Sequence, residues 1–159
     1  MQLTRVPSMK VGMLIRRPPE DVFQAIADPA ITTKFWFTKS SGKMLPGADL
    51  AWEWEMYGVS SRVRVQEIER DRRIRFTWSG YDPQWPTTVE FRFLPWQDHA
   101  TYIQITESGF TGDGDTLVQR VVDSTTGFTF VLSALKALLE HDCVLRLVMD
   151  AHPAGLEVR

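Results

Sequence analysis

The sequence predicts an α+β domain in which a curved antiparallel sheet of about six strands wraps around a long C-terminal helix, with two short helices after the first strand. Three observations carry this prediction. Apolar and polar residues alternate, strand after strand, between residues 48 and 108. Steps of three and four separate the apolar residues between Asp115 and Leu139. A segment rich in proline and acidic residues follows a first apolar stretch.

The N-terminal part predicts one strand and two short helices. Met9 to Ile15 is mostly apolar and predicts the strand. Pro18, Pro19 and the acidic residues after them favour a helix start, and Asp28-Pro29 ends that helix. A second helix is expected from about Pro29 to the aromatic run 35–37. Three aromatic side chains in a predicted loop indicate a plug across one end of an internal cavity, acting either as a gate or as a static lid.

Five strands in a meander are predicted next. The segment "DLAWEWEM" alternates between two faces, as in an antiparallel strand with one wet face. Leu50, Trp52, Trp54 and Met56 share one face, and the other carries Ala51, Glu53 and Glu55. Segments 59–68, 73–78, 87–94 and 101–108 repeat the alternation. The period breaks after Val65, which predicts a β-bulge. The inner face of this sheet is rich in aromatic residues.

One long amphipathic helix is predicted from about Asp115 to Leu139. Gly127 lies in its middle, where it would permit close approach to the sheet or a slight kink, or else divide the segment into two helices. The tail beyond it contains Pro153 and Gly155 and is expected to be frayed or only loosely docked. Only the long helix can cover the apolar face of the sheet, and such packing tends to leave space at one end.

The composition excludes several classes of protein. A chain of 159 residues suits one domain, 1–159, with a core at about 8–140 and a tail at 141–159. A net charge of -2 offers no field for nucleic acid or anionic lipid. No apolar segment has the length of a signal peptide, and charged residues interrupt each later apolar run before the roughly 18 residues of a membrane span. The single Cys143 favours the cytoplasm.

Several local strings, taken in order, resemble a known family. They are "PPEDVFQAIADPA" followed by the aromatic cluster around Trp36, then "PGADL", "VQEIERDRRIRFTW", "TVEFRF", "ITESGF" and "GFTFVLSALKALLE". This pattern resembles the homologues of the heat-shock-protein ATPase activator, within the START or SRPBCC superfamily, whose fold is called helix-grip. The family usually has Trp where this chain has Phe128, and often two consecutive Trp at the Phe35-Trp36 position. Both departures would reshape a pocket.

The resemblance implies a fold more than an activity, since the superfamily includes lipid carriers, plant hormone receptors and polyketide cyclases. The activators that stimulate the chaperone ATPase carry an additional N-terminal domain, for which a chain of this length has no room. We expect binding of a small hydrophobic or aromatic molecule between the sheet and the C-terminal helix, with no cofactor and no covalent chemistry. One alternative is a polyketide-cyclase-like or hydratase-like enzyme. Another is a protein-interaction or co-chaperone-like module with a filled core, including a homodimer.

Glu107 is the charged residue most suited to a role in such a cavity. The period of two turns it inward at a strand end, where it would act as acid or base if the protein is an enzyme; otherwise it reaches solvent or caps backbone N–H groups. Tyr102 or Thr87 would help to orient a ligand. The inward aromatic side chains would stack on a flat ligand or fill the core completely. The candidate ligand-binding residues are Trp36, Trp52, Trp54, Trp78, Phe91, Glu107, Phe110 and Phe128.

Other chemistry finds little support in the sequence. His99, His141 and His152 lack metal-ligand spacing, so no metal site is expected. Cys143 has no neighbouring base pattern and is expected to be a passive thiol. The arginines between positions 62 and 75 alternate with acidic residues, which favours a solvated outer sheet face over a nucleic-acid surface.

Overall fold

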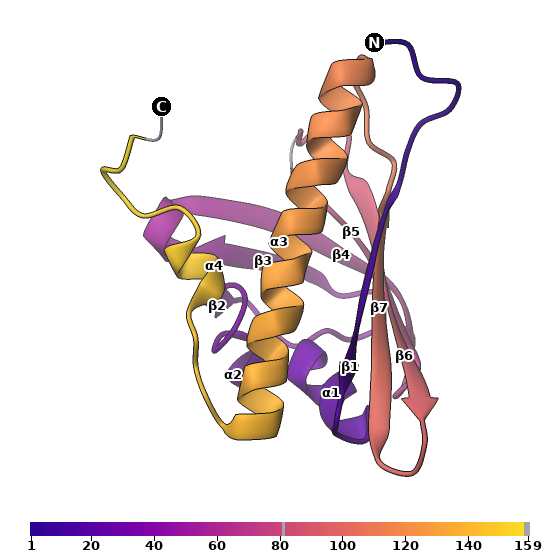
Figure 1. Cartoon of the computed structure of the whole chain (residues 1–159), viewed down its shortest axis with the longest axis vertical. Helices are drawn as coiled ribbons and strands as arrows, with labels where there is room; N and C mark the ends of the chain where they lie inside the picture. The colour runs from indigo at the N-terminus through magenta and orange to yellow at the C-terminus, as the bar shows by residue number, and fades with distance from the viewer. Residues whose placement is uncertain (81, 158–159) are drawn as a thin grey trace.

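One antiparallel sheet and one long helix make up most of the structure (Figure 1), a computed structural model that describes residues 1–80 and 82–157. The described strands form a 7-stranded sheet in the order β1-β7-β6-β5-β4-β3-β2. Their bounds are β1 (Met9–Ile15), β2 (Lys39–Ser40), β3 (Asp49–Trp54), β4 (Val59–Glu69), β5 (Arg73–Trp78), β6 (Thr87–Trp96) and β7 (Ala100–Ser108).

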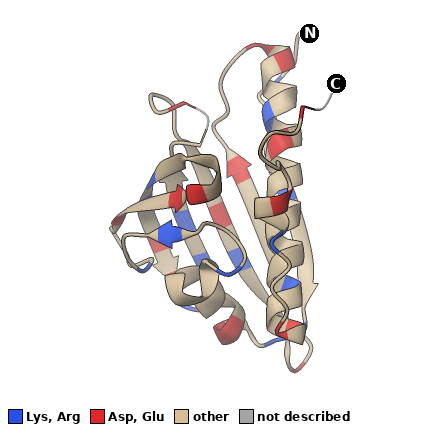
Figure 2. Ribbon diagram, turned by 90° about the vertical axis from the view of Figure 1, so that its left-hand side faces the viewer, with Lys and Arg blue, Asp and Glu red and all other residues tan. Residues whose placement is uncertain are grey.

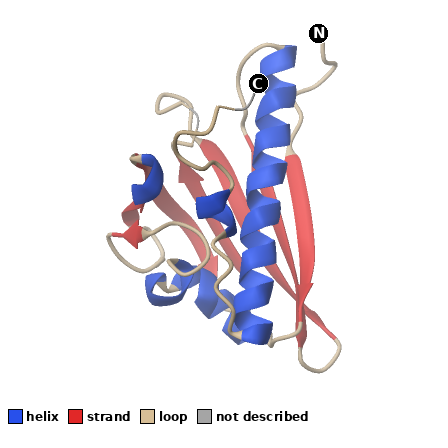
Figure 3. Cartoon of the chain, turned by 60° about the vertical axis from the view of Figure 1, so that its left-hand side comes forward, coloured by secondary structure: helices blue, strands red, loops and turns tan. Residues whose placement is uncertain are grey.

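The helices lie on one side of the sheet and at one of its ends (Figure 3). They are α1 (Pro19–Ala27), α2 (Pro29–Thr32), the 3-10 helix η1 (Glu55–Tyr57), α3 (Gly114–His141) and α4 (Leu147–Asp150). The side chain of Asp113 caps α3 by accepting a hydrogen bond from the backbone N–H of Thr116 at 2.8 Å, as an N-cap carboxylate should. α3 is continuous through Gly127, so the division into two helices does not occur.

The predicted meander is confirmed, because β3 to β7 pair in sequence order and β1 returns to pair with β7. The register shifts between Val65 and Glu67, which confirms the bulge. The sheet differs from the prediction in two places. The strand β2 adds one two-residue element beside β3, too short to show any alternation, and the 3-10 helix η1 takes Met56 out of the predicted strand.

The core lies between the sheet and α3, and all three consecutive aromatic residues are buried in it. Phe37 stacks on Trp52 with ring centroids 4.3 Å apart. Trp36 lies against four other rings from the sheet and α3, with centroid distances of 4.9 to 5.9 Å: those of Trp52, Trp78, Phe91 and Phe128. The cluster therefore joins the loop after α2 to both layers of the fold.

By length and composition, α3 is the one helix among residues 1–80 and 82–157 that could cross a membrane. This differs from the expectation that charges interrupt every apolar run early enough. The same helix packs on the sheet, and 39% of its most apolar stretch is buried inside the structure. A core helix passes the same test, so the finding is weak support for a membrane span.

Basic and acidic residues are interspersed along the strands of the sheet (Figure 2). Glu90 accepts hydrogen bonds from Arg92 at 2.6 Å and from Arg75 at 3.0 Å. Partial burial raises the pKa of the Glu90 carboxyl, but the hydrogen bonds and charges of Arg92 and Arg75 outweigh burial and hold that pKa below its usual value. Asp49 and Arg62 form another pair across β3 and β4. Paired charges of this kind fit a solvated face.

Candidate ligand-binding cavity

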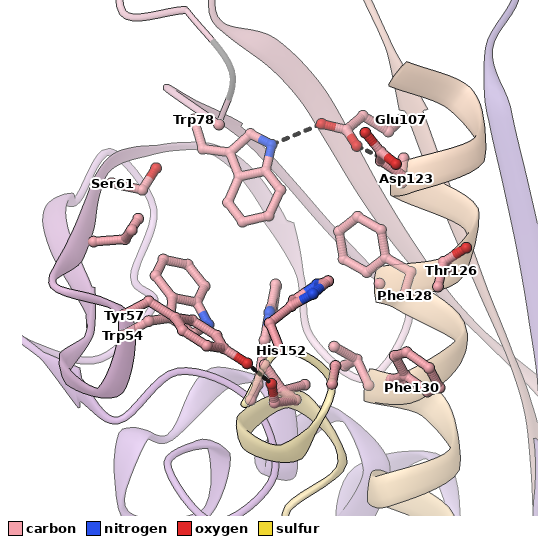
Figure 4. A pocket seen from close by; sticks show the side chains of 18 of the residues that line it. Trp54, Tyr57, Ser61, Trp78, Glu107, Asp123, Thr126, Phe128, Phe130 and His152 are labelled. Atoms are coloured by element: carbon pink, nitrogen blue, oxygen red, sulfur yellow. Dashed lines mark hydrogen bonds between the residues drawn. The ribbon is translucent and has the colours of Figure 1, made fainter. Parts of the chain in front are cut away.

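A cavity of about 560 Å³ opens between the middle of α3, the ends of β3 to β5 and the C-terminal segment (Figure 4). Each wall comes from a different part of the chain. The residues that line it are Trp36, Trp54, Tyr57, Val59, Ser60, Ser61, Trp78, Ser79, Gly80, Glu107, Asp123, Ser124, Thr126, Gly127, Phe128, Phe130, Val131, Val148, Ala151 and His152.

Glu107 lies at the end of β7 with only 1% of its surface exposed. Its Oε2 accepts hydrogen bonds from the indole N–H of Trp78 at 2.8 Å and from the hydroxyl of Thr87 at 2.5 Å. Its Oε1 accepts one from the hydroxyl of Ser124 on α3 at 2.6 Å. The side chain therefore neither reaches solvent nor relies on a backbone cap. An indole N–H can only donate, so Glu107 Oε2 serves as its acceptor.

The aromatic walls pack on one another and still leave the cavity open. Trp78 lies 5.8 Å from Phe128, 5.9 Å from Trp36 and 6.2 Å from Trp54 between ring centroids. These distances are typical of edge-to-face and tilted aromatic pairs. The rings of Trp36, Trp54, Trp78 and Phe128 therefore form one continuous aromatic wall of the cavity.

The segment from α4 to His152 closes one side of the cavity, whereas the residues that follow it up to Glu157, among them Pro153 and Gly155, are exposed. The hydroxyl of Tyr57 donates to the carbonyl oxygen of Val148 and also lies 3.0 Å from that of Met149. The ring of Tyr57 meets that of His152 with centroids 6.0 Å apart. Figure 1 shows the segment running back beside α3. The last two residues of the predicted tail, 158 and 159, lie outside the described part.

Five of the eight predicted ligand-binding residues line the cavity: Trp36, Trp54, Trp78, Glu107 and Phe128. The other three are buried elsewhere. Trp36 lies 4.9 Å from Trp52 and 5.8 Å from Phe91 between ring centroids, so it covers both. Phe110 is buried after the turn at Gly109, whose φ of 89° redirects the chain, and it does not line the cavity.

Three smaller expectations need correction or refinement. Tyr102 cannot orient a ligand, because it lies on the outer sheet face, 38% exposed, with its ring directly over Gly12. Thr87 acts on Glu107 instead of lining the cavity. Gly127 does not permit close approach to the sheet, since a Cβ built there meets nothing within 4 Å.

The sequence interpretation missed much of the polar and C-terminal lining. Ser124 had a usable signal, because it lies one helical turn before Phe128 on the same stripe of α3. Tyr57 and His152 had none, since their contacts join segments far apart in sequence. Among the described residues there is no group of three or more His, Cys, Asp or Glu side chains that could hold a metal ion. Cys143 is exposed.

A curved antiparallel sheet closed by one long helix around an internal cavity defines a helix-grip domain of the START/SRPBCC type. The chain belongs to the family of activator of Hsp90 ATPase homolog 1-like proteins, whose family model matches residues 16–140. This agrees with the family resemblance of the sequence strings.

Solved structures with the same fold include three that differ in source. Protein SSP2350 from Staphylococcus saprophyticus shares 26% sequence identity, with a TM-score of 0.74 over 88% of this chain and 96% of that chain. The Aha1 dimer from Colwellia psychrerythraea shares 19%, with a TM-score of 0.72 over 85% and 97%. CalU16 from Micromonospora echinospora shares 17%, with a TM-score of 0.68 over 90% and 82%. No curated protein matches the chain.

Proposed function

We propose that this protein binds a small hydrophobic or aromatic molecule in the cavity between the sheet and α3, without covalent chemistry. The observation that carries the proposal is a cavity of about 560 Å³ whose walls combine Trp, Phe and Tyr side chains with Ser, Thr, His and acidic side chains. Pockets for small molecules commonly measure roughly 300–1,000 Å³ and have this mixture of lining residues. Burying about 200 Å² of apolar ligand surface would contribute about 5 kcal/mol before the entropy cost of binding.

An enzyme that uses Glu107 as general acid or base is the second candidate. Its position in the cavity wall favours this candidate, since a catalytic carboxylate must meet its substrate. The three side-chain hydrogen bonds hold the Glu107 carboxyl in one orientation, which favours a structural role over proton transfer. Retained binding with lost turnover in Glu107→Gln would identify an enzyme; we expect no turnover to lose.

Two further parts of the proposal concern the setting of the protein. A cytoplasmic location is supported by a lone, exposed Cys143, because disulfides mark oxidising compartments. A homodimer is supported by the dimer formed by the relative from Colwellia psychrerythraea. Light scattering coupled to size exclusion would give the mass, and a monomer at all concentrations would contradict the dimer.

Titration with the neutral apolar probe N-phenyl-1-naphthylamine tests the binding proposal. We expect saturation at one site, quenched Trp emission and a thermal midpoint that rises with probe concentration. Gly127→Leu should abolish binding, because its side chain would project from α3 at the cavity wall. Thr125→Leu is the matched control, since Thr125 is exposed on the same helix and does not line the cavity. Binding by Gly127→Leu equal to that of the control would refute the proposal.

A further inference from the structure

Acidic side chains outnumber basic ones among the described residues that line the cavity. Two of its lining residues, Glu107 and Asp123, carry carboxylates. No Lys or Arg occurs among the described residues that line it. Arg120 lies one helical turn before Ser124 and is not part of the lining. A ligand in this cavity therefore meets acidic groups and aromatic rings at close range.

Both carboxylates lie at the same end of the cavity. Asp123 directly precedes Ser124, whose hydroxyl binds Glu107 Oε1 at 2.6 Å. Figure 4 shows Glu107 and Asp123 together beside α3, with Trp78 and Phe128 next to them. Among the described residues, Glu107 Oε1 accepts one hydrogen bond, whereas Oε2 accepts two, so Oε1 keeps capacity for a further donor.

This combination of groups discriminates between ligands by charge. An ammonium group near two carboxylates is attracted electrostatically, and the attraction is stronger where water is partly excluded. The faces of Trp and Phe rings add a cation–π attraction for the same group. A carboxylate or phosphate ligand would meet repulsion from both acidic side chains, and His152 is the one basic side chain among the described lining residues.

Ser61 supplies an independent sign that a polar ligand atom belongs in the cavity. Its Oγ is buried without a hydrogen-bond partner among the described residues, and only 5% of the residue is exposed. The residue lines the cavity from β4, across from α3. Buried hydroxyls almost always have a partner, so an unpaired one in a cavity wall indicates that a ligand atom or an ordered water completes it.

We propose that the ligand is a flat aromatic amine that carries a positive charge, a class that rests on the proposed binding function. Its ammonium group lies at the Glu107 and Asp123 end, within reach of Glu107 Oε1. Its ring lies along Trp54, Trp78 and Phe128. Ser61 binds a polar substituent on the ring. The cavity thereby selects against fatty acids and other anionic ligands of similar size.

Three matched naphthalene probes test this selectivity: 2-naphthylmethylammonium, 2-naphthylmethanol and 2-naphthoate. They share one ring system and differ in charge. We expect the ammonium probe to bind at least about tenfold more tightly than the carboxylate, with the alcohol between them. Calorimetry at low ionic strength gives each dissociation constant. The ratio for the two charged probes should shrink as salt is added, since Asp123 is exposed enough to be screened.

Two variants connect the preference to the acidic residues. Glu107→Gln and Asp123→Asn should each reduce the ammonium-to-carboxylate affinity ratio by about threefold or more. Asp123 is exposed on α3, so its variant remains folded even if the buried position proves sensitive. Asp115→Asn is the control, because this carboxylate lies two turns earlier on the same helix and pairs with the N-terminus. The ammonium-to-carboxylate affinity ratio of Asp115→Asn should equal that of the unmodified protein.

The outcomes separate this inference from the proposed function. Equal binding of all three probes would refute the charge preference and leave the hydrophobic cavity in place. Tighter binding of 2-naphthoate would also refute the charge preference. It would indicate that the positive charge of Arg120 outweighs the two carboxylates inside the cavity. Failure of every probe, together with no effect of Gly127→Leu on N-phenyl-1-naphthylamine, would overturn the binding proposal itself.

Discussion

Replacing Glu107 by residues of similar size should separate its role as a hydrogen-bond acceptor from its role as a charge. Glu107→Leu keeps most of the volume but removes both acceptor oxygens. Glu107→Gln keeps one oxygen and adds an amide donor. Because Glu107 serves three side-chain donors at 2.5 to 2.8 Å, the two variants should differ widely in stability.

The size of the difference follows from what each donor can do afterwards. The indole N–H of Trp78 can only donate, so Leu at position 107 leaves it unpaired, at about 1–3 kcal/mol for a buried donor. The hydroxyls of Thr87 and Ser124 can rotate toward other acceptors, so the loss of their hydrogen bonds to Glu107 costs less stability. Glu107→Leu should therefore destabilise the fold by about 2–5 kcal/mol. In Glu107→Gln, the amide oxygen can accept from Trp78 and Thr87 while the amide N–H donates to Ser124, so about 1 kcal/mol is expected.

Thermal and urea unfolding followed by circular dichroism measure this difference. A domain of this size changes its midpoint by about 2–4 °C per kcal/mol, so Glu107→Leu should lower it by about 4–20 °C. Glu53→Leu is a control on β3, where the side chain is 41% exposed and pairs, among the described residues, only with the exposed Lys39, so a substitution should matter little. If Glu107→Leu were as stable as Glu107→Gln, the hydrogen bonds would not hold the cavity end together, and the reasoning would be wrong.

Three further predictions concern α3, the C-terminal segment and the outer sheet face. Gly127→Ala should raise the free energy of unfolding by up to about 1 kcal/mol, because its Cβ meets nothing within 4 Å; a loss in urea titration would show hidden crowding. Tyr57→Phe should speed amide exchange in residues 142–157 while global stability falls by only about 1 kcal/mol; unchanged exchange would contradict the docking role. Glu90 has a lowered pKa when folded, so its contribution is full above pH 4.5 and is lost as pH falls through the lower folded value. Glu90→Gln should accordingly lose less stability between about pH 5 and pH 3 than the unmodified protein does. If the two proteins lost stability equally over this range, Glu90 would not be the group responsible.

The elements of the fold could be read from the sequence because their signals are local. Alternation in the segments from Leu50 onward identified the inner face of each strand, since the side-chain period of a strand is two. The break after Val65 marked the bulge for the same reason. The long stripe of α3 predicted a helix that covers the sheet. Strand β2 was not predicted, because two residues are too few to show an alternating pattern.

The candidate site was only half predictable. The alternating pattern predicted that Trp54, Trp78 and Glu107 point inward, and all three line the cavity. The same pattern predicted that Trp52 and Phe91 point inward, but Trp36, from a loop distant in the sequence, covers both of them. Facing the core is thus necessary for lining a cavity but does not suffice, because the cavity is the space left after other side chains have packed.

The sequence by itself determined the family, the strands and helices, and the inward position of an acidic residue at the end of β7. Only the tertiary structure decided which side chains meet. It brought the donors of Trp78, Thr87 and Ser124 to Glu107, and it folded the C-terminal segment onto Tyr57. The physical reason is that periodicity records the environment of each element separately, whereas hydrogen bonds and cavity walls depend on packing between elements distant in the chain.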